Sequence, residues 1–364
     1  MTRREFLLTS AAAAAALPLR GLAEPAPKAR PQPKIPRWRG FNLQGSSWGQ
    51  LDIAFRESDF ELMADWGFNF ARLPLAYWSW ASPKNWKHID GDKLKPVDQA
   101  IEWGRRYGVY INLCMHRIPG YCVNGRELEP YQLFDSPRDD MLRALDAGVY
   151  HWKYLSDRYR DVPSSRLSFD LFNEPPFMKD QSRYVEIART LIAGIREVSP
   201  DRLITADGAD LGQTPVLDLV DEGIVQSTRG YLPKMISHYM ATWVPPAEFE
   251  SLAKPTWPMR DKNGVLWDKE KLRAELITKW KPVTDQGVPI HVGEWGCWIK
   301  TPRQACIGWM TDLLSLWKEA GWGWSLWNLR GGFGILDSDR VETRYEDYKG
   351  HKLDREMLEL LLAH

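Results

Sequence analysis

Two stretches of the sequence each place a glutamate directly after a short, largely apolar segment. They are Phe169-Asp170-Leu171-Phe172-Asn173-Glu174-Pro175-Pro176, with Glu174, and Ile290-His291-Val292-Gly293-Glu294-Trp295-Gly296, with Glu294. Both segments are short and largely apolar, as buried parallel strands are. A carboxylate that directly follows a buried strand loses hydration, which is costly unless a partner or a substrate needs the group there. Either glutamate alone would be interpreted as a helix cap or as an ion-pair partner. Together they predict a working pair at the carboxyl ends of two strands.

Eight β-like segments alternate with helical segments along the chain. We expect strands at residues 39–43, 69–74, 109–115, 167–173, 203–206, 235–239, 289–293 and 323–328. We expect helices at residues 58–66, 96–107, 139–159, 182–198, 214–221, 268–285, 302–320 and 354–362. This alternation predicts an α/β fold, a (β/α)8 TIM barrel formed by residues 37–364 as a single domain. A doubly wound sheet is the alternative, but no Gly-x-Gly-x-x-Gly turn follows the first strand.

Charge and composition exclude several classes of protein. The 364 residues include 48 lysines and arginines against 48 aspartates and glutamates, and this zero net charge removes the electrostatic case for nucleic-acid binding. Four cysteines are too few for a disulfide scaffold, and whether any of them pair is left open. The 19 tryptophans, 13 tyrosines and 12 phenylalanines exceed what a core requires, so we expect some to face a ligand.

The amino-terminal residues are expected to direct export. Arg3-Arg4 precedes an apolar run from Phe6 to Leu17, and a small-x-small site ends at Ala23. This pattern predicts a twin-arginine signal peptide over residues 1–23, with an uncleaved anchor as the alternative. Residues 24–36 are rich in proline and predict a linker. Because no other apolar run reaches spanning length, we expect a mature protein without a membrane span, periplasmic or secreted.

Polar side chains follow other expected strands. Arg72 lies near the end of the second expected strand, His116 follows the third, and His238 and Tyr239 end the sixth. Two histidines and two glutamates are one way to build a metal site, but no His-Glu-x-x-His helix or comparable spacing occurs, so we expect no metal and no cofactor. An arginine beside a strand-end carboxylate would keep that carboxylate ionised.

Two carboxylates near tryptophans are the groups that glycoside hydrolysis uses. One carboxyl protonates the leaving oxygen, the other attacks the anomeric carbon or activates water, and aromatic faces stack on sugar rings. Trp327 is the best stacking candidate, because strand alternation directs Trp322 and Trp324 to the opposite side. Three more tryptophans fall in the long segment after strand six and would suit either a binding loop or a minor core: Trp243, Trp257 and Trp267.

These elements in this order resemble glycoside hydrolase family 5, the cellulase-like family of clan A. The resemblance spans residues 38–337 and rests on Asn173-Glu174-Pro175, Glu294, Arg72, His116, His238-Tyr239 and Trp327. It implies a retaining double displacement with Glu174 as general acid/base and Glu294 as nucleophile. It also implies the binding roles: Asn173 would bond the sugar 2-hydroxyl, Arg72 and Tyr239 would orient Glu294, His116 and His238 would line the subsite, and Trp327 would form its floor.

The resemblance defines the substrate less sharply. β-1,4-Glucan comes first, because cellulase-like endoglucanase action is the commonest activity that it implies. The loop from His116 to Gly125 is more similar to the exo-β-glucanase branch, and the long segment after strand six would close one end of a cleft. Exo-acting β-glucanase or β-glucosidase and mannanase are therefore the alternatives. The expected partner is a β-glucan polysaccharide or oligosaccharide, and the oligomeric state is left open.

Two other classes of protein were weighed. Gly45-Ser46-Ser47-Trp48-Gly49 fits the nucleophile elbow of an esterase, but the next helical segment starts only at Ser58, so the required strand-turn-helix context is missing. A non-catalytic carbohydrate-binding barrel would keep the aromatic residues, but the presence of both glutamates argues against it.

Overall fold

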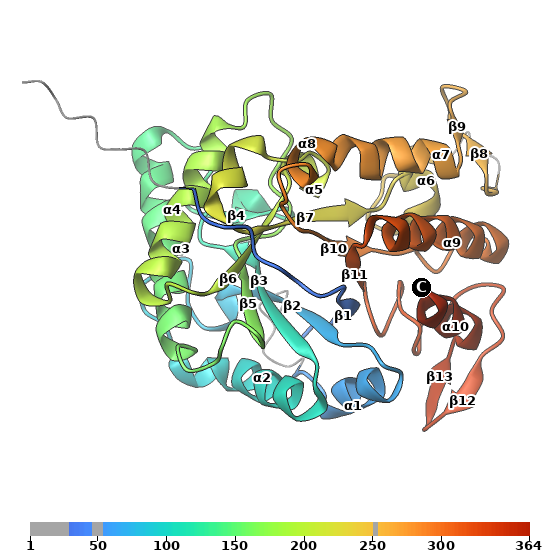
Figure 1. Cartoon of the computed structure of the whole chain (residues 1–364), viewed down its shortest axis with the longest axis horizontal. Helices are drawn as coiled ribbons and strands as arrows, with labels where there is room; N and C mark the ends of the chain where they lie inside the picture. Colours follow the sequence, from blue (N-terminus) through green and yellow to red (C-terminus); the bar gives the residue numbers. More distant parts are fainter. Residues whose placement is uncertain (1–28, 46–53, 250–253) are drawn as a thin grey trace, which may run out of the picture.

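A closed barrel of eight parallel strands forms the centre of the molecule in the computed structural model, which describes residues 29–45, 54–249 and 254–364 (Figure 1). β1 pairs with both β2 and β11, and this pairing closes the ring. In order around the barrel, the strands are β1 Arg39–Asn42, β2 Phe70–Ala76, β3 Tyr110–Ile118, β5 Leu167–Asp170, β6 Leu203–Asp207, β7 Val225–Gly230, β10 Ile290–Trp295 and β11 Gly323–Leu326. The predicted TIM barrel is confirmed.

Helices cover the outside of the barrel (Figure 1). The longer ones are α1 Glu57–Asp65, α2 Lys95–Tyr107, α3 Arg138–Arg158, α4 Ser182–Val198, α9 Arg303–Ala320 and α10 Arg355–Ala363. The four-residue helices are α5 Ala209–Gly212, α6 Lys234–Ser237, α7 Lys269–Leu272 and α8 Lys281–Thr284. A π-helical turn, Arg273–Ile277, and 3-10 turns at Tyr77–Ser79, Gly91–Leu94, Arg126–Leu128, Leu217–Glu222, Pro246–Glu248 and Thr278–Trp280 complete the set.

Short antiparallel strands decorate this frame. β4 Tyr121–Cys122 folds back on the end of β3. β8 Met259–Arg260 pairs with β9 Leu266–Trp267, and β12 Glu346–Tyr348 pairs with β13 His351–Leu353. Within the described ranges, no helix is long and apolar enough to cross a membrane.

Local sequence explains where the elements begin and end. Helix α2 has a proline in its first turn, arginines in its last turn, and Gly108 with φ 71° at its end, where glycine adopts the left-handed conformation without strain. Every residue of β2 and of β3 is buried. Strands that are buried on both faces consist mostly of apolar residues, so the few polar residues in them indicate a functional site.

The sixth predicted strand is wrong. The barrel uses β7, residues 225–230, whereas residues 235–239 begin in the short helix α6 after Pro233. The sequence of β7 is Val-Gln-Ser-Thr-Arg-Gly, which has no apolar run, yet all six residues are buried. Its polar side chains are satisfied inside the protein: Gln226 bonds the backbone of Val216 in both directions, and Thr228 donates to the carbonyl of Gly212. A search for apolar runs therefore passes over this strand.

Two predictions fall outside the described residues. They are the signal peptide over residues 1–23 with the start of its linker, and the Ser46 to Gly49 part of the esterase elbow. Residues 29–36 of the linker contain no helix or strand.

Candidate active site

Glu174 and Glu294 meet at the carboxyl end of the barrel. Glu174 follows β5 and has a φ of 51°, a left-handed conformation that is costly for a residue with a Cβ and is concentrated at functional sites. Glu294 lies within β10, opposite Arg229 of β7, where the β7–β10 register shifts between Val292 and Glu294. The side chain of Glu294 is 6% exposed. The barrel therefore brings together the two glutamates predicted from the sequence.

Arg72 connects Glu294 to its surroundings. Its Nη1 donates to Glu294 Oε1 at 2.6 Å and to Asn42 Oδ1 at 3.0 Å, and its Nε donates to Asp170 Oδ2 at 2.9 Å. Its Nη2 donates to Asn173 Oδ1 at 2.8 Å. Since this guanidinium is 1% exposed, its orientation is fixed by these contacts, and it holds Glu294 in turn.

Arg229 is a site residue that sequence reasoning missed. Its Nε donates to Glu174 Oε1 at 3.0 Å, and its Nη2 lies 3.6 Å from Glu294 Oε1. It also forms a two-pronged ion pair with Asp207 at the end of β6. The sequence could have indicated this residue through Arg229-Gly230-Tyr231, an arginine two residues before a tyrosine. This segment lies at the end of β7, the strand that the search for apolar runs passed over.

The two glutamates have pKa values displaced in opposite directions. Burial, followed by the negative charge of Glu294, raises the pKa of Glu174 to about 7, against the opposing effect of Arg229. Burial also acts to raise the pKa of Glu294, but Arg229 and Arg72 outweigh it and hold that pKa below its usual range. At neutral pH the pair can therefore hold one proton on Glu174 and a negative charge on Glu294, an arrangement suited to acid and nucleophile.

Tyr231 takes the position predicted for Tyr239. The Tyr231 hydroxyl lies 3.3 Å from Glu294 Oε2. Tyr239 instead packs its ring against Phe249, with centroids 5.8 Å apart. This correction follows from the misplaced strand, because the residues that face the site come directly after β7. His238 lies beside Tyr231, with ring centroids 4.9 Å apart.

Trp327 and His116 form a stacked pair, with ring centroids 5.8 Å apart and an interplanar angle of 20°. Trp327 is half-buried, whereas Trp322 and Trp324 are buried. Burial lowers the pKa of His116 to about 4, so this ring is neutral at pH 7. A neutral histidine beside a half-exposed indole can line a sugar subsite without competing for the proton of the glutamate pair.

A second aromatic group, formed by Trp243, Trp298 and Phe333, lies next to His238. The Trp243 ring is 4.7 Å from Trp298 and 6.1 Å from Phe333, and Trp243 is 56% exposed. Of the predicted loop tryptophans, only Trp243 joins this group through the described ring contacts. Trp257 donates to Asp312 on α9, and Trp267 donates to Asp261 in the β8–β9 hairpin.

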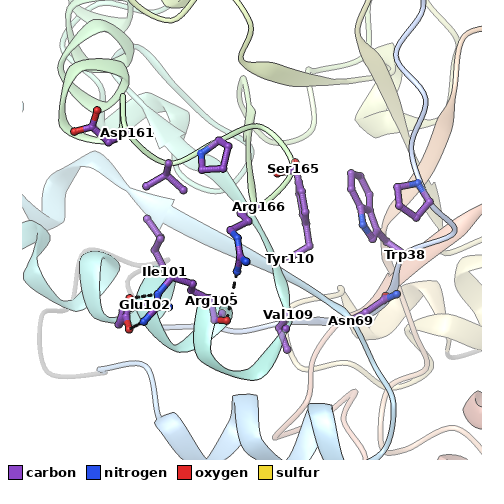
Figure 2. Close-up of a pocket in the computed structure, with 15 residues that line it drawn as sticks. Trp38, Asn69, Ile101, Glu102, Arg105, Val109, Tyr110, Asp161, Ser165 and Arg166 are labelled. Carbon is purple, nitrogen blue, oxygen red and sulfur yellow. Dashed lines mark hydrogen bonds and ion pairs between the residues drawn. The ribbon is translucent and has the colours of Figure 1, made fainter.

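A large pocket lies at the other end of the barrel. The cavity has a volume of about 600 Å³ and is lined in part by Trp38, Asn69 and Val109 at the starts of strands. Figure 2 shows these residues, and it also shows the ion pair between Glu102 and Arg105, one turn apart on α2. Chemistry in TIM barrels takes place at the carboxyl ends of the strands, so the pocket's volume does not make it the active site.

Comparisons with known proteins agree with this geometry. The family model of the cellulase domain of glycosyl hydrolase family 5 matches residues 28–332. Endoglucanase C of Acetivibrio thermocellus is 26% identical over 84% of this chain and 95% of its own. Glucan 1,3-beta-glucosidase 1 of Schizosaccharomyces pombe is 30% identical over 33% of this chain and 29% of its own. A crystal structure described as a glycoside hydrolase superposes with a TM-score of 0.83 and 34% identity, covering 90% of this chain and 99% of its own. The chain therefore belongs to glycosyl hydrolase family 5, and it is a glycoside hydrolase.

Proposed function

We propose that this glycoside hydrolase cleaves β-linked glucan with retention of configuration, with Glu294 as nucleophile and Glu174 as general acid/base. The proposal rests on one observation above all. The carboxyl groups of buried Glu294 and of largely buried Glu174 contact the same guanidinium, yet the pKa of Glu174 is raised to about 7 and that of Glu294 is lowered. Different environments for two carboxyl groups are what assign acid and nucleophile in such pairs.

The reaction proceeds in two displacements. Glu294 attacks the anomeric carbon while Glu174 transfers its proton to the departing glycosidic oxygen, which leaves a glycosyl ester on Glu294 and a carboxylate on Glu174. That carboxylate then takes a proton from water as the water attacks the same carbon and releases Glu294. Each displacement inverts the carbon, so the product has the configuration of the substrate. Proton NMR of freshly released sugar should show the β-anomer first, and an initial α-anomer contradicts the nucleophile assignment.

Asn173 is suited to bind the sugar at the cleaved bond. Its Oδ1 accepts from both Arg72 and Arg229 at 2.8 Å, which fixes which side of the amide is the oxygen. Its Nδ2 is buried, with no hydrogen-bond partner among the described protein atoms. Since a buried unpaired donor is costly, a substrate hydroxyl is the natural partner for it. This agrees with the 2-hydroxyl contact expected from the family resemblance.

Cellulase-like endo cleavage of β-1,4-glucan is the substrate assignment that we put first, supported by the name of the relative from Acetivibrio thermocellus. Exo cleavage is the second candidate, and one observation favours it. The β3–β4 hairpin lies against the catalytic loop, because the Tyr121 hydroxyl donates to the Glu174 carbonyl at 2.6 Å. A hairpin fixed this close to the acid would shorten the cleft at that side.

Reducing-sugar release from a panel of polymers tests the function directly. The panel contains β-1,4-glucan, mixed-linkage glucan, laminarin, mannan and xylan, and it compares the wild type with Glu294→Gln. Release from a β-glucan that the variant abolishes supports the proposal, and product length then separates endo from exo action. Binding of glucan without release by the wild type refutes hydrolysis and favours a carbohydrate-binding barrel.

We also propose export by the twin-arginine route, from the Arg3-Arg4 pattern. Replacing both arginines with lysine should keep the full-length chain in the cytoplasm of a bacterial host. Unchanged export of that variant refutes the route.

A further inference from the structure

Arg229 occupies a space that two glycines leave open. A Cβ on Gly293 of β10 would lie 2.9 Å from Arg229 Nη1, and a Cβ on Gly212 would lie 2.8 Å from Arg229 Cγ. Arg229 itself is 2% exposed. Because neighbouring elements lack side chains at these two points, the guanidinium can extend between β6, β7 and β10 and reach both glutamates.

Asp207 would be enough to satisfy Arg229 as a structural ion pair. It accepts from Nη1 at 2.9 Å and also from Nη2, which is the bidentate geometry of a strong arginine–carboxylate pair. Nη1 also donates to Ser227 Oγ at 3.1 Å and to the Thr228 carbonyl at 3.2 Å, whereas donors on Nε and Nη2 point to the catalytic groups. Nε bonds Glu174 at 3.0 Å, and Nη2 bonds Asn173 at 2.8 Å and lies 3.6 Å from Glu294. A purely structural arginine has no need of these contacts.

The proposed two-step reaction moves one negative charge between the glutamates. Before the first displacement the charge is on Glu294, and in the glycosyl-enzyme it is on Glu174. Arg72 contacts Glu294 at 2.6 Å, and none of its described hydrogen bonds goes to Glu174. A cation in contact with Glu294 alone would oppose the transfer of negative charge from Glu294 to Glu174. A cation in contact with both carboxylates would not oppose it.

We propose that Arg229 is the shared counter-ion of the two catalytic glutamates and stabilises the negative charge as it passes from Glu294 to Glu174 in each turnover. This inference rests on the proposed retaining function. It assigns Arg229 a role at the reacting carboxyl groups beyond its ion pair with Asp207.

Several charged and titratable groups face this pair from the surrounding strands and loops. They are Arg72 from β2, Cys114 and His116 from β3, Tyr121 from β4, Asp170 from β5, Asp207 from β6, Arg229 from β7, and Tyr231 and His238 after it. Of these groups, only the two arginines are cationic at neutral pH, since burial lowers the pKa of both His116 and His238 to about 4. Removal of Arg229 should therefore raise the pKa of Glu174 above its value of about 7, and should raise the pKa of Glu294 as well.

The experiment measures the pKa of Glu174 without requiring turnover. Protein with ¹³C-labelled glutamate carboxyl groups is titrated by NMR, and the Glu174 signal is assigned by its loss in Glu174→Gln. In a Glu294→Gln background, residue 294 is neutral, as it would be in the glycosyl ester. There, adding Arg229→Gln should raise the pKa of Glu174 by about one unit or more, the effect of losing a cation in contact. An unchanged pKa in this pair of variants overturns the proposal.

Kinetics with two leaving groups test the role in turnover. An aryl cellobioside with a poor leaving group needs the proton of Glu174, whereas a dinitrophenyl cellobioside does not. In Arg229→Gln, kcat/KM for the first substrate should fall by about tenfold or more, with a much smaller loss for the second. Both substrates are compared at a pH where Glu294 stays ionised in the variant. Equal losses there mean that Arg229 does not assist proton transfer from Glu174, which overturns the proposal. Wild type that hydrolyses neither cellobioside and releases no sugar from any β-glucan of the polymer panel refutes the proposed function, and with it a role in turnover, while the NMR result still decides whether Arg229 acts as a counter-ion of Glu174.

Two further variants guard against loss of folding. Arg229→Gln leaves Asp207 buried without its cation, so Asp207→Asn/Arg229→Gln removes both charges together. The pKa of Glu174 should still rise in this double variant, because Arg229 contacts the Glu174 carboxyl and lowers its pKa more than Asp207, which contacts Glu174 at the backbone N–H, raises it. Arg202→Gln is the matched control, since Arg202 is a buried arginine at the start of β6 that bonds the carbonyls of Leu167 and Tyr159. It should lower stability without moving the pKa of Glu174, and a shift equal to that of Arg229→Gln overturns the proposal.

Discussion

Replacing Tyr231 with phenylalanine removes one hydrogen-bond donor from the proposed nucleophile and little else. The hydroxyl lies 3.3 Å from Glu294 Oε2, and the ring contacts His238 and Phe333 at centroid distances of 4.9 and 6.2 Å. Phenylalanine keeps both ring contacts. A hydrogen bond to a charged group contributes about 1.5–3 kcal/mol, and 3.3 Å is long for an O–H donor, so we take the lower end of about 1.5 kcal/mol. That corresponds to about a tenfold loss in kcat/KM.

The assay compares Tyr231→Phe with Tyr239→Phe on the β-glucan that the wild type hydrolyses fastest. Tyr239 lies eight residues further along the chain, and its ring packs on Phe249, a contact that phenylalanine preserves. We expect kcat/KM of Tyr239→Phe to stay within about twofold of the wild type, with urea unfolding of both variants as a check on folding. A tenfold loss in Tyr239→Phe with none in Tyr231→Phe would refute the assignment of the Glu294 contact.

Four other outcomes follow from the site and its supports. Glu174→Ala should lower kcat/KM for a poor leaving group by about 10²–10⁴, and azide, a second nucleophile that needs no general base, should restore kcat on a dinitrophenyl cellobioside, whose first step needs no acid. Wild-type kcat/KM should fall above about pH 7 as Glu174 loses its proton, and fall in acid as Glu294 gains one; an alkaline limb that stays in place in Glu174→Gln belongs to a group other than Glu174. Glu129→Gln leaves Arg117 without the partner that it bonds at 2.8 Å, and should lower the free energy of unfolding in urea by about 3–5 kcal/mol; a loss under 1 kcal/mol would contradict burial of the pair. Burial lowers the pKa of His151 to about 4, so the folded state binds fewer protons than the unfolded state; stability should drop as the pH falls from about 6.5 towards 4, and His151→Gln should flatten that slope.

The sequence predicted most of the barrel because apolar strands and amphipathic helices leave periodic patterns. Seven predicted strand segments overlap barrel strands, and both glutamates were found from their positions after apolar runs. The strand that failed, β7, is buried but polar, since Gln226, Thr228 and Arg229 all find partners inside the protein. Hydrophobic periodicity identifies residues that are buried because their own side chains are apolar. It does not report polar residues whose burial depends on partners from distant parts of the chain.

The same limit explains the candidate site. Arg72 could be identified because it lies in an apolar segment, and the structure places it against Glu294. Arg229 could not be identified from the sequence, because its partners come from three different strands or the loops that follow them. No short-range sequence spacing indicates that these residues lie together. Tyr239 was chosen over Tyr231 only because strand six was placed too late in the sequence.

The number of arginines in contact with each carboxyl explains why the pKa values of the proposed acid and the proposed nucleophile differ. Four carboxyl groups lie at the site, namely Asp170, Asp207, Glu174 and Glu294, but in the described part of the chain only two guanidinium groups contact them. Burial makes the excess negative charge costly, so the cluster is stabilised by taking up a proton. Glu294 contacts both arginines, whereas Glu174 contacts only Arg229 among the described residues. The proton therefore goes to Glu174, and one arginine fewer at that carboxyl than at its neighbour gives the proposed general acid its proton near neutral pH.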